Sequence, residues 1–324
     1  MSVAGERSLR SLSGRHPAGY QPHDLHSSDR VYVETNCYAD IIIELLHACG
    51  YEPLAAFGHL VRMDFEGDQW TFFKPPPEDL ERLFGVDIHE MQPYRDMPTQ
   101  IAEQLQRGRT MIVELDSWYL PDTASTSYRC EHVKTSVAAD AIDPGGETLR
   151  YFHGAGLHEL SGADYRGVFR IGELSADVLP PYTELVRFDA GPRLADDDLH
   201  DAALDVLRGH LARRPDSNPF ARFGEQLTRE LPNLLAGGPD EFHAYAFATV
   251  RMAGSAFEVA AAHVRWLLGP AAAPAAAAMI EIVEGAKTLS FRLARRRAFD
   301  VEPPIAALAG AWERALDVLA QVAG

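Results

Sequence analysis

Apolar positions in the first 190 residues come in short runs that alternate with proline and glycine. Apolar and β-branched runs predict strands, and the Pro144–Gly146 turn joins the second strand to the third. Helical spacing of apolar positions, ended by glycine, predicts helices before the strands. The predicted strands are 110–118, 132–143 and 148–154, and the predicted helices are 37–49, 77–84 and 97–107. These patterns indicate an α+β fold, in which helices precede a small antiparallel sheet.

The pattern changes near residue 190, after which almost every stretch has helical spacing. Asp196, Asp197 and Asp198 suit the start of the first helix, because the helix dipole favours negative charge there. The predicted helices are 196–213, 219–236, 240–268, 275–298 and 304–323. We therefore expect an α+β domain over residues 1–190 and an α-helical bundle over residues 191–324.

Composition narrows the class of protein. The chain is 46% hydrophobic and 24% charged, as in globular proteins, and its net charge of −17 opposes binding to nucleic acid or anionic lipid. No uncharged apolar run reaches about 18 residues, and no apolar core follows Arg7, Arg10 and Arg15, so we expect neither a membrane span nor a secretory signal. The three cysteines suggest reduced thiols in the cytoplasm, and no pattern for a metal or a bound cofactor is found.

The helix over 37–49 is apolar on nearly every side, which predicts a buried position, yet it begins with Cys37. Backbone N–H groups at a helix start stabilise a thiolate and can stabilise an oxyanion, so Cys37 is a candidate nucleophile. The alternative is a small core residue, as reduced cysteines often are. Asp40, Glu44 and His47 share the stripe of Cys37 at three- and four-residue steps.

A cysteine nucleophile needs a base, and the best candidate is His132. His132 opens a predicted strand that follows a strand ending at Asp116, so antiparallel pairing predicts that the two residues are neighbours. The third strand returns toward His132 and ends at His153 and Gly154. Asp143 lies at the other end of the hairpin, roughly 35 Å away, and is rejected as a partner. The alternative for His132 is an ordinary histidine at a strand edge.

Aromatic, amide and basic side chains are candidates for binding a substrate. Gln69 is a possible oxyanion donor, with a packed loop as the alternative, while Trp118 and Tyr119 line a pocket or pack in the core. Cys49, at the end of the first helix, is expected to be structural because the dipole raises its pKa. The candidate substrate-binding residues are Gln69, Trp70, Trp118, Tyr119 and Arg251.

Long stretches of the chain resemble domain-of-unknown-function family 1839: "ETNCYADIIIELLHACGYEP", "DFEGDQWTFFKPPPEDLERLFG", "VELDSWYLPDTASTSYRCEHVKT" and "YFHGAG". This resemblance covers most of the chain. A helix that opens with cysteine, followed by a sheet with histidine at one strand, resembles the order of papain-like enzymes. More distantly, "ELDSWYLP" and "EHV" resemble the N-terminal domain of the BtrH-type butirosin acyltransferases.

These resemblances imply a papain-like, cysteine-peptidase-like N-terminal domain that transfers an acyl or aminoacyl group from a carrier-protein thioester. The phosphopantetheine arm of the carrier would be part of the substrate, and no cofactor would be bound. Cys37 would be the nucleophile and His132 the base. The resemblance implies an asparagine at the position of Gly154, so Asp116 or His153 is left to orient His132.

The expected partners are an acyl or aminoacyl carrier protein and a small-molecule or protein acceptor. Carrier proteins are acidic, so a basic patch on the helical half is a candidate docking surface, with solvated helix faces as the alternative. The patch consists of Arg251, Lys287, Arg292, Arg295, Arg296 and Arg297. Two other functions fit the same residues: a cysteine hydrolase (peptidase, amidase or thioesterase), and a carrier-binding protein without chemistry.

Overall fold

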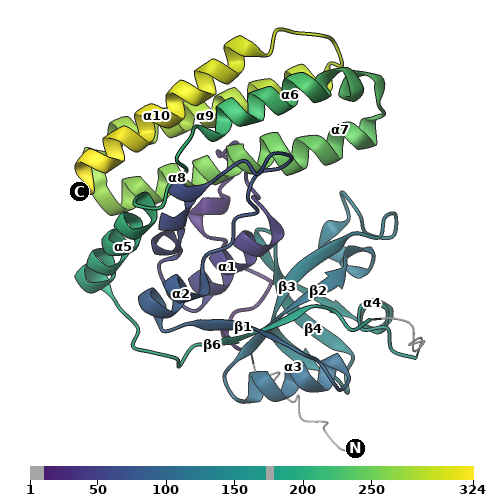
Figure 1. The fold of residues 1–324 in the computed structure, drawn as a ribbon. Helices are drawn as coiled ribbons and strands as arrows, with labels where there is room; N and C mark the ends of the chain where they lie inside the picture. The colour runs from purple at the N-terminus through teal and green to yellow at the C-terminus, as the bar shows by residue number, and fades with distance from the viewer. Residues whose placement is uncertain (1–10, 173–178) are drawn as a thin grey trace, which may run out of the picture. The chain divides into compact units, whose positions relative to one another are not determined.

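The computed structural model describes residues 11–172 and 179–324, and its contacts divide the chain into two compact units (Figure 1). The sheet unit comprises Met1–His23, Asp40–Glu52 and Leu80–Arg193. The helical unit comprises Asp24–Ala39, Pro53–Asp79 and Leu194–Gly324. Two segments from the first 80 residues thus belong with the C-terminal helices. The predicted division between residues 190 and 191 had assigned both segments to the N-terminal domain. Part of the N-terminal segment, residues 1–10, lies outside the described residues.

The sheet unit is built on one antiparallel sheet with the strand order β1-β6-β2-β3-β4-β5. The prediction of an α+β fold with a small antiparallel sheet is confirmed, and the three predicted strands are β2, β3 and β4. The sheet is larger than predicted, because β1, β5 and β6 join it. The strands are β1 (Asp87–Met91), β2 (Thr110–Asp116), β3 (Lys134–Asp143), β4 (Thr148–His153), β5 (Gly156–Ser161) and β6 (Thr183–Arg187).

The β2–β3 connection positions the predicted base. Asp116 pairs with Lys134 in the sheet register, and the chain between them forms the 3-10 helices η3 (Ser117–Tyr119) and η4 (Pro121–Thr123). The prediction that His132 opens a strand is therefore wrong, because His132 lies in the loop just before β3. The loop leaves the ladder because η3 begins directly after Asp116, whose carboxylate accepts a hydrogen bond from the Trp118 N–H.

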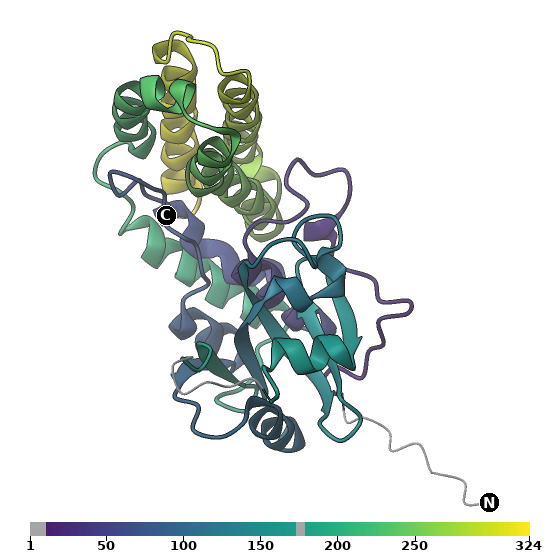
Figure 2. The ribbon, with the colours of Figure 1, turned by 90° about the vertical axis from the view of Figure 1, so that its right-hand side faces the viewer.

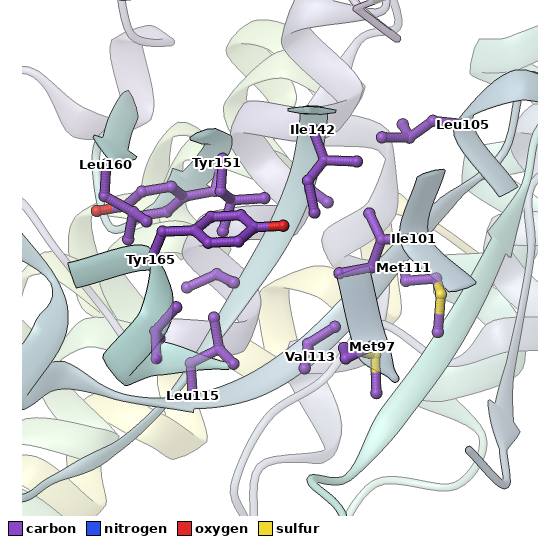
Figure 3. Close-up of a cluster of buried hydrophobic side chains, with 14 of the residues drawn as sticks. Met97, Ile101, Leu105, Met111, Val113, Leu115, Ile142, Tyr151, Leu160 and Tyr165 are labelled. Atoms are coloured by element: carbon purple, nitrogen blue, oxygen red, sulfur yellow. The ribbon is translucent and has the colours of Figure 1, made fainter. Parts of the chain in front are cut away.

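Two helices cover one face of the sheet. The helix α3 (Met97–Gln106) packs against β2 and β3, and α4 (Ala163–Val168) packs against β5 and η3. Asp96 caps α3 by accepting a hydrogen bond from the Thr99 N–H at 3.0 Å. Figure 3 shows the apolar cluster between these layers, in which α3 and α4 contribute side chains such as Ile101 and Tyr165. This face of the sheet is a hydrophobic core, which fixes the ends of β2 and β3.

The helix α1 (Cys37–Ala48) crosses the division of the chain, since its residues from Asp40 onward belong to the sheet unit. In that unit the fully buried Glu44 accepts hydrogen bonds from the Tyr20 hydroxyl at 2.6 Å and the His23 N–H at 3.0 Å. His47 contacts the carbonyl of Gln21. The polar stripe of α1 thus holds the N-terminal segment in place.

The helix α2 (Pro77–Phe84) ends as its sequence predicts. Gly85 follows it with φ 66°, the left-handed conformation that glycine adopts most easily. A Cβ atom at Gly85 would also collide with the carbonyl of Gly191 in the sheet unit, so only glycine fits at this position.

The helical unit confirms the prediction of a helical C-terminal region. Its helix α10 packs against both α9 and α6, and Figure 2 shows these helices from a second side. A single turn of π-helix lies between α7 and α8. The elements are η1 (Asp24–His26), η2 (Pro53–Arg62), α5 (Asp196–Leu211), α6 (Pro219–Ala236), α7 (Pro239–Ala246), the π-helix η5 (Phe247–Arg251), α8 (Met252–Leu268), η6 (Gly269–Ala272), α9 (Ala273–Ala294) and α10 (Glu302–Val322).

One stretch of the helical unit, Pro239–Ala294, is long and apolar enough to cross a membrane when judged by length and composition alone. Core helices of water-soluble proteins meet the same criterion, so the finding is weak evidence for a span. The expectation that no segment crosses a membrane stays a prediction.

Candidate functional site

Asp116 and His132 form a hydrogen-bonded pair in the sheet unit. The Nδ1 atom of His132 lies 2.7 Å from Oδ2 of Asp116, and Oδ1 of the same carboxylate accepts the Trp118 N–H at 3.0 Å. The prediction that Asp116 and His132 are neighbours is therefore confirmed. One carboxylate holds the backbone of η3 and the ring of His132 at the same time.

Trp118 completes the setting of this histidine. Its ring stacks on the ring of His132, with centroids 4.5 Å apart and an angle of 8° between the planes. Because the carboxylate of Asp116 can only accept, Nδ1 of His132 carries a proton. The Nε2 atom has no hydrogen-bond partner among the described residues, and the side chain of His132 is 64% exposed. The arrangement leaves an accessible nitrogen that can take up a proton.

The Asp116–His132 pair lies in the wall of a cavity of about 960 Å³ in the sheet unit. Residues at the start of α3, including Met97, form another part of the wall, and Tyr165 and Val168 of α4 form a third. A cavity of this size, largely apolar and with a few polar groups, is typical of small-molecule sites. His132 can therefore meet a ligand as well as solvent.

His153 has different partners from His132. Its Nδ1 lies 2.5 Å from Oδ2 of Asp122, and its Nε2 lies 2.8 Å from the hydroxyl of Thr135. Burial would raise the pKa of Asp122, but the hydrogen bond and charge of His153 outweigh it and lower that pKa. Both ring nitrogens of His153 are thus engaged. Asp116, and not His153, is the residue that contacts His132.

The position for which the resemblance implies an asparagine, Gly154, lies in the turn between β4 and β5 with φ 50°. Glycine and asparagine are the residues that most readily adopt this left-handed conformation. The turn therefore accounts for both residue types by backbone conformation alone.

Cys37 begins α1 in the helical unit and is half-buried. The buried Asn36 caps the helix, since its Oδ1 accepts the N–H groups of Tyr38 at 3.1 Å and Ala39 at 2.9 Å. Its Nδ2 donates to the carbonyl of Phe73 at 3.1 Å. The cap fixes the position of Cys37, but it also occupies two of the N–H groups that we expected to be available for an oxyanion.

The π-helix η5 holds the segment that leads to Cys37. Nη2 of Arg251, the last residue of η5, donates to the carbonyl of Glu34 at 3.1 Å. Glu258 on α8 accepts the N–H groups of Val31 at 2.9 Å and Tyr32 at 2.8 Å. Single π-turns inside helices are frequent at functional sites. In this structure Arg251 thus binds backbone, which makes it a support for the Cys37 segment.

The candidates Gln69 and Trp70 lie in a tight loop of the helical unit. Gln69 is exposed, and its carbonyl accepts the Glu66 N–H at 2.9 Å. Trp70 is buried, and its ring packs against Phe220, with centroids 4.7 Å apart, and against Phe223. This packing favours the alternative of a packed loop.

Tyr119 packs tightly in the sheet unit, where its ring leaves no room for a Cβ atom at Gly167 of α4. It is partly buried and packs against the apolar cluster between the sheet and its helices. Of the two candidate aromatic residues in the β2–β3 connection, Trp118 contacts the predicted base and Tyr119 serves packing.

The other two cysteines, Cys49 and Cys130, form no disulfide and have no proposed catalytic role. Burial, aided by the nearby carboxylate of Asp140, raises the pKa of Cys49 to about 12, in the direction expected of a structural residue. Cys130 is exposed and donates to the carbonyl of Thr126.

Apart from Arg251, which is half-buried on η5, the basic patch consists of exposed side chains on α9 and just after it. Arg296 donates to the carbonyl of Gly237, and Arg292 lies over the ring of Phe299 at 5.9 Å. These contacts fit the alternative of ordinary partners at a helix end.

Sequence reasoning missed a cluster of buried histidines in the helical unit. Nε2 of His210 lies 2.7 Å from Oδ2 of Asp79, and the ring of His59 lies 6.3 Å from that of His210. Nδ1 of His263 lies 2.7 Å from the carbonyl of Leu54. Burial lowers the pKa of His59 to about 3 and that of His263 to about 4. These residues share no sequence spacing, so no pattern predicts the cluster.

The described part of the chain contains no group of three or more His, Cys, Asp and Glu side chains in the arrangement of a metal site. A search of curated proteins found no match to the chain. The family profile for the DUF1839 N-terminal domain matches residues 21–188, and the profile for the DUF1839 C-terminal domain matches residues 196–321. The two matches cover most of the sequence, and the chain belongs to the DUF1839 family.

Proposed function

We propose that the protein is a cysteine-dependent acyltransferase, in which Cys37 takes an acyl or aminoacyl group from a carrier-protein thioester. His132 is the general base and acid, and Asp116 orients it. The observation that carries the proposal is the Asp116–His132 pair, with its 2.7 Å hydrogen bond and an exposed Nε2. The half-buried Cys37 at the start of a capped helix supports it.

The proposed reaction has two steps. His132 takes the proton of the Cys37 thiol, the sulfur attacks the thioester carbonyl, and a tetrahedral oxyanion forms. The oxyanion collapses, the carrier thiol leaves with the proton from His132, and Cys37 is acylated. An amine or thiol acceptor then attacks, His132 takes its proton, and the Cys37 sulfur leaves. Each step moves one proton and one acyl group, with no change of oxidation state.

The setting of the reaction is part of the proposal. The partners are an acyl or aminoacyl carrier protein, whose phosphopantetheine arm enters the site, and an acceptor in a cytoplasmic biosynthetic pathway. The sheet unit with α1 is proposed to be a papain-like domain, distantly related to the BtrH-type acyltransferases. The order of the cysteine helix α1 and the histidine before β3 supports this relationship.

A hydrolase is the second candidate. The exposure of His132 favours it, because water can reach Nε2 and replace the amine as the acceptor. The same acyl-enzyme would then release a free acid from a thioester, an amide or a peptide.

The test is the intact mass of the protein after incubation with aminoacyl-loaded carrier protein. We expect the wild type to gain the mass of the aminoacyl group and Cys37→Ala to gain nothing. Cys130→Ala is the matched control, because it removes an exposed thiol that has no proposed role and should acylate like the wild type. Product analysis with and without added amines then separates the transferase from the hydrolase.

A wild type that gains no mass and leaves the loaded carrier intact, across several aminoacyl groups, would point to carrier binding without chemistry. The proposed pairing of Cys37 with His132 has its own test. In the Cys49→Ala and Cys130→Ala background, His132→Cys should be linked to Cys37 by dibromobimane, which fluoresces strongly only after joining two thiols. A cross-link that forms only in the unfolded protein would contradict the pairing.

A further inference from the structure

We infer that the cavity of the sheet unit binds an apolar organic anion, such as the ionised form of an aromatic or aliphatic acid. The apolar body of this ligand would lie against the residues at the start of α3 and the end of α4, and its negative charge would pair with the guanidinium of Arg170. The inference goes beyond the proposed function, because it concerns binding at Arg170 and holds whatever chemistry takes place at His132.

The cavity gathers exposed apolar surface. Of the eleven large hydrophobic side chains that are exposed among the described residues, five line this cavity: Tyr94, Val133, Ile171, Leu179 and Tyr182. The wall also includes the buried side chains of Met97, Leu115 and Val168. Exposed hydrophobic side chains that lie singly are ordinary, whereas a group of them at one place marks a binding site. A volume of about 960 Å³ is enough for a bicyclic ring or an acyl chain.

Arg170, which lines the same cavity, has an unusual backbone conformation just after α4. Its φ is 53°, a left-handed value at which glycine is the ordinary residue. The N–H of Arg170 donates to the carbonyl of Gly167 at 3.0 Å. The N–H of Ile171 donates to the carbonyl of Arg166 at 2.8 Å. These two bonds form the Schellman motif, in which the position of Arg170 is usually glycine. An arginine is less stable there than glycine, so its side chain is a candidate for a function.

The guanidinium of Arg170 also differs from those of two other arginines with positive φ. Arg129 pairs with the carboxylate of Asp164. Arg296 donates to the carbonyl of Gly237. The side chain of Arg170 is exposed and has no hydrogen-bond or ion-pair partner among the described residues. Of these three arginines, Arg170 therefore has the charge that a ligand can neutralise.

The other charged groups of the described wall have partners. Each of the other basic side chains lies 2.7 Å from a carboxylate, in the pairs Arg95–Glu103, His132–Asp116 and Lys134–Glu114. The remaining acid of the described wall, Asp96, accepts the Thr99 N–H at the start of α3, where the helix dipole offsets its charge. Arg170 is therefore the cation of this part of the chain that has no carboxylate beside it. In a protein with a net charge of −17, an anionic ligand needs such a local cation.

Two fluorescent probes with the same apolar body test the inference. N-phenyl-1-naphthylamine is uncharged, and 8-anilinonaphthalene-1-sulfonate is the same molecule with one added sulfonate. We expect both probes to bind the wild-type full chain saturably. In Arg170→Gln, the Kd of the sulfonate should rise about tenfold, because its charge loses the guanidinium. The Kd of the uncharged probe should change by less than about twofold.

Arg95→Gln is the matched control for charge. It removes one positive charge from the same wall, but that charge is paired with Glu103, so both Kd values should change by less than about twofold. Arg170→Gly is the control for the fold. Glycine suits a φ of 53°, so the midpoint of thermal unfolding should not fall, and the sulfonate should lose affinity as in Arg170→Gln.

Ile171→Ser locates the apolar body of the probes. It shortens a half-exposed side chain of the wall, so both Kd values should rise about fivefold and their ratio should stay the same. The inference is overturned if the wild type does not bind the sulfonate, if Arg170→Gln and Arg95→Gln change the ratio equally, or if Ile171→Ser binds both probes as the wild type does. None of these results depends on Cys37, so failure here is distinct from failure of the acyltransferase proposal.

Discussion

Among the described residues, two Asp–His pairs have the same 2.7 Å hydrogen bond and opposite surroundings. In the sheet unit, His132 contacts Asp116 and its side chain is 64% exposed. In the helical unit, His210 contacts Asp79 and its side chain is 1% exposed. The second nitrogen of His210 lies 3.3 Å from Nη2 of Arg213, whereas that of His132 has no partner among the described residues.

A carboxylate beside an imidazole therefore does not by itself mark a catalytic site. The pair at His210 satisfies two buried polar groups, which is what folding requires. The pair at His132 is exposed to water, so its hydrogen bond contributes little to the free energy of unfolding. What distinguishes a candidate base is the accessible second nitrogen, and substitutions at the two pairs should therefore have different effects.

The largest effect is expected on activity. His132→Ala should lower the rate of acylation at Cys37 about 10³-fold, because the thiol loses its general base. The rate of mass gain with aminoacyl-loaded carrier protein measures it. Asp116→Asn, which keeps the shape of the pair, should fall between His132→Ala and the wild type. Equal rates in all three proteins would remove His132 from the mechanism.

The next effect is on stability, and it should occur at the other pair. His210→Ala leaves the buried Asp79 without its partner and should lower the free energy of unfolding by about 3 kcal/mol. His132→Ala should change it by less than about 0.5 kcal/mol, since the ring is exposed. Urea unfolding followed by circular dichroism gives both values. A stability loss that is larger for His132→Ala would reverse the comparison.

Acid should weaken the helical unit through its buried histidines. The pKa values of His59, about 3, and His263, about 4, lie below the ordinary value of 6.5, so the unfolded chain binds the additional protons as pH falls. The stability is complete above pH 6.5 and is lost progressively down to the folded-state pKa values. At pH 5.5 each of the two histidines should lower the free energy of unfolding by about 1.4 kcal/mol.

Urea unfolding at pH 7.5 and 5.5 checks this loss. His263→Gln removes one titrating ring, so the difference between the two pH values should shrink by about 1.4 kcal/mol in that variant. An unchanged difference would mean that His263 does not titrate as its burial implies.

The smallest effect compares the two tyrosines of the sheet unit. Tyr165→Phe removes a buried hydroxyl without a partner and should raise the free energy of unfolding by about 1 kcal/mol. Tyr151→Phe removes a donor to Asp122 and should lower it by a similar amount. Thermal unfolding of the two variants measures the sign. A loss of stability in Tyr165→Phe would show that its hydroxyl is satisfied by water.

The sequence predicted contacts well where neighbouring strands determine them. Asp116 and His132 could be placed together because one ends a strand and the other precedes the next, and antiparallel pairing brings those points together. The pairing of His153 with Asp122 could not be predicted, since Asp122 lies in a 3-10 turn whose path no pattern sets. Only the side-chain contacts between the ends of β2 and β3 could therefore be predicted from the sequence.

The strands β1 and β6 show the same limit in the fold. They pair with each other although they lie far apart in the sequence, at residues 87–91 and 183–187, so no turn marks them as a hairpin. Each has only five residues, and β1 has one buried position, so the alternation that reveals a strand is absent. Trp70 illustrates the converse, because its polar loop looks like a binding surface in sequence and is held by core aromatic rings.

The stack of Trp118 on His132 makes the candidate base visible in solution. The other three tryptophans of the chain, Trp70, Trp266 and Trp312, all belong to the helical unit, so Trp118 is the indole of the sheet unit. A protonated imidazole quenches the emission of an indole that it stacks on, whereas the neutral ring does so weakly. In a protein whose other tryptophans are replaced by phenylalanine, emission against pH would thus trace the ionisation of His132, and any ligand that lifts the ring would brighten the signal without a label.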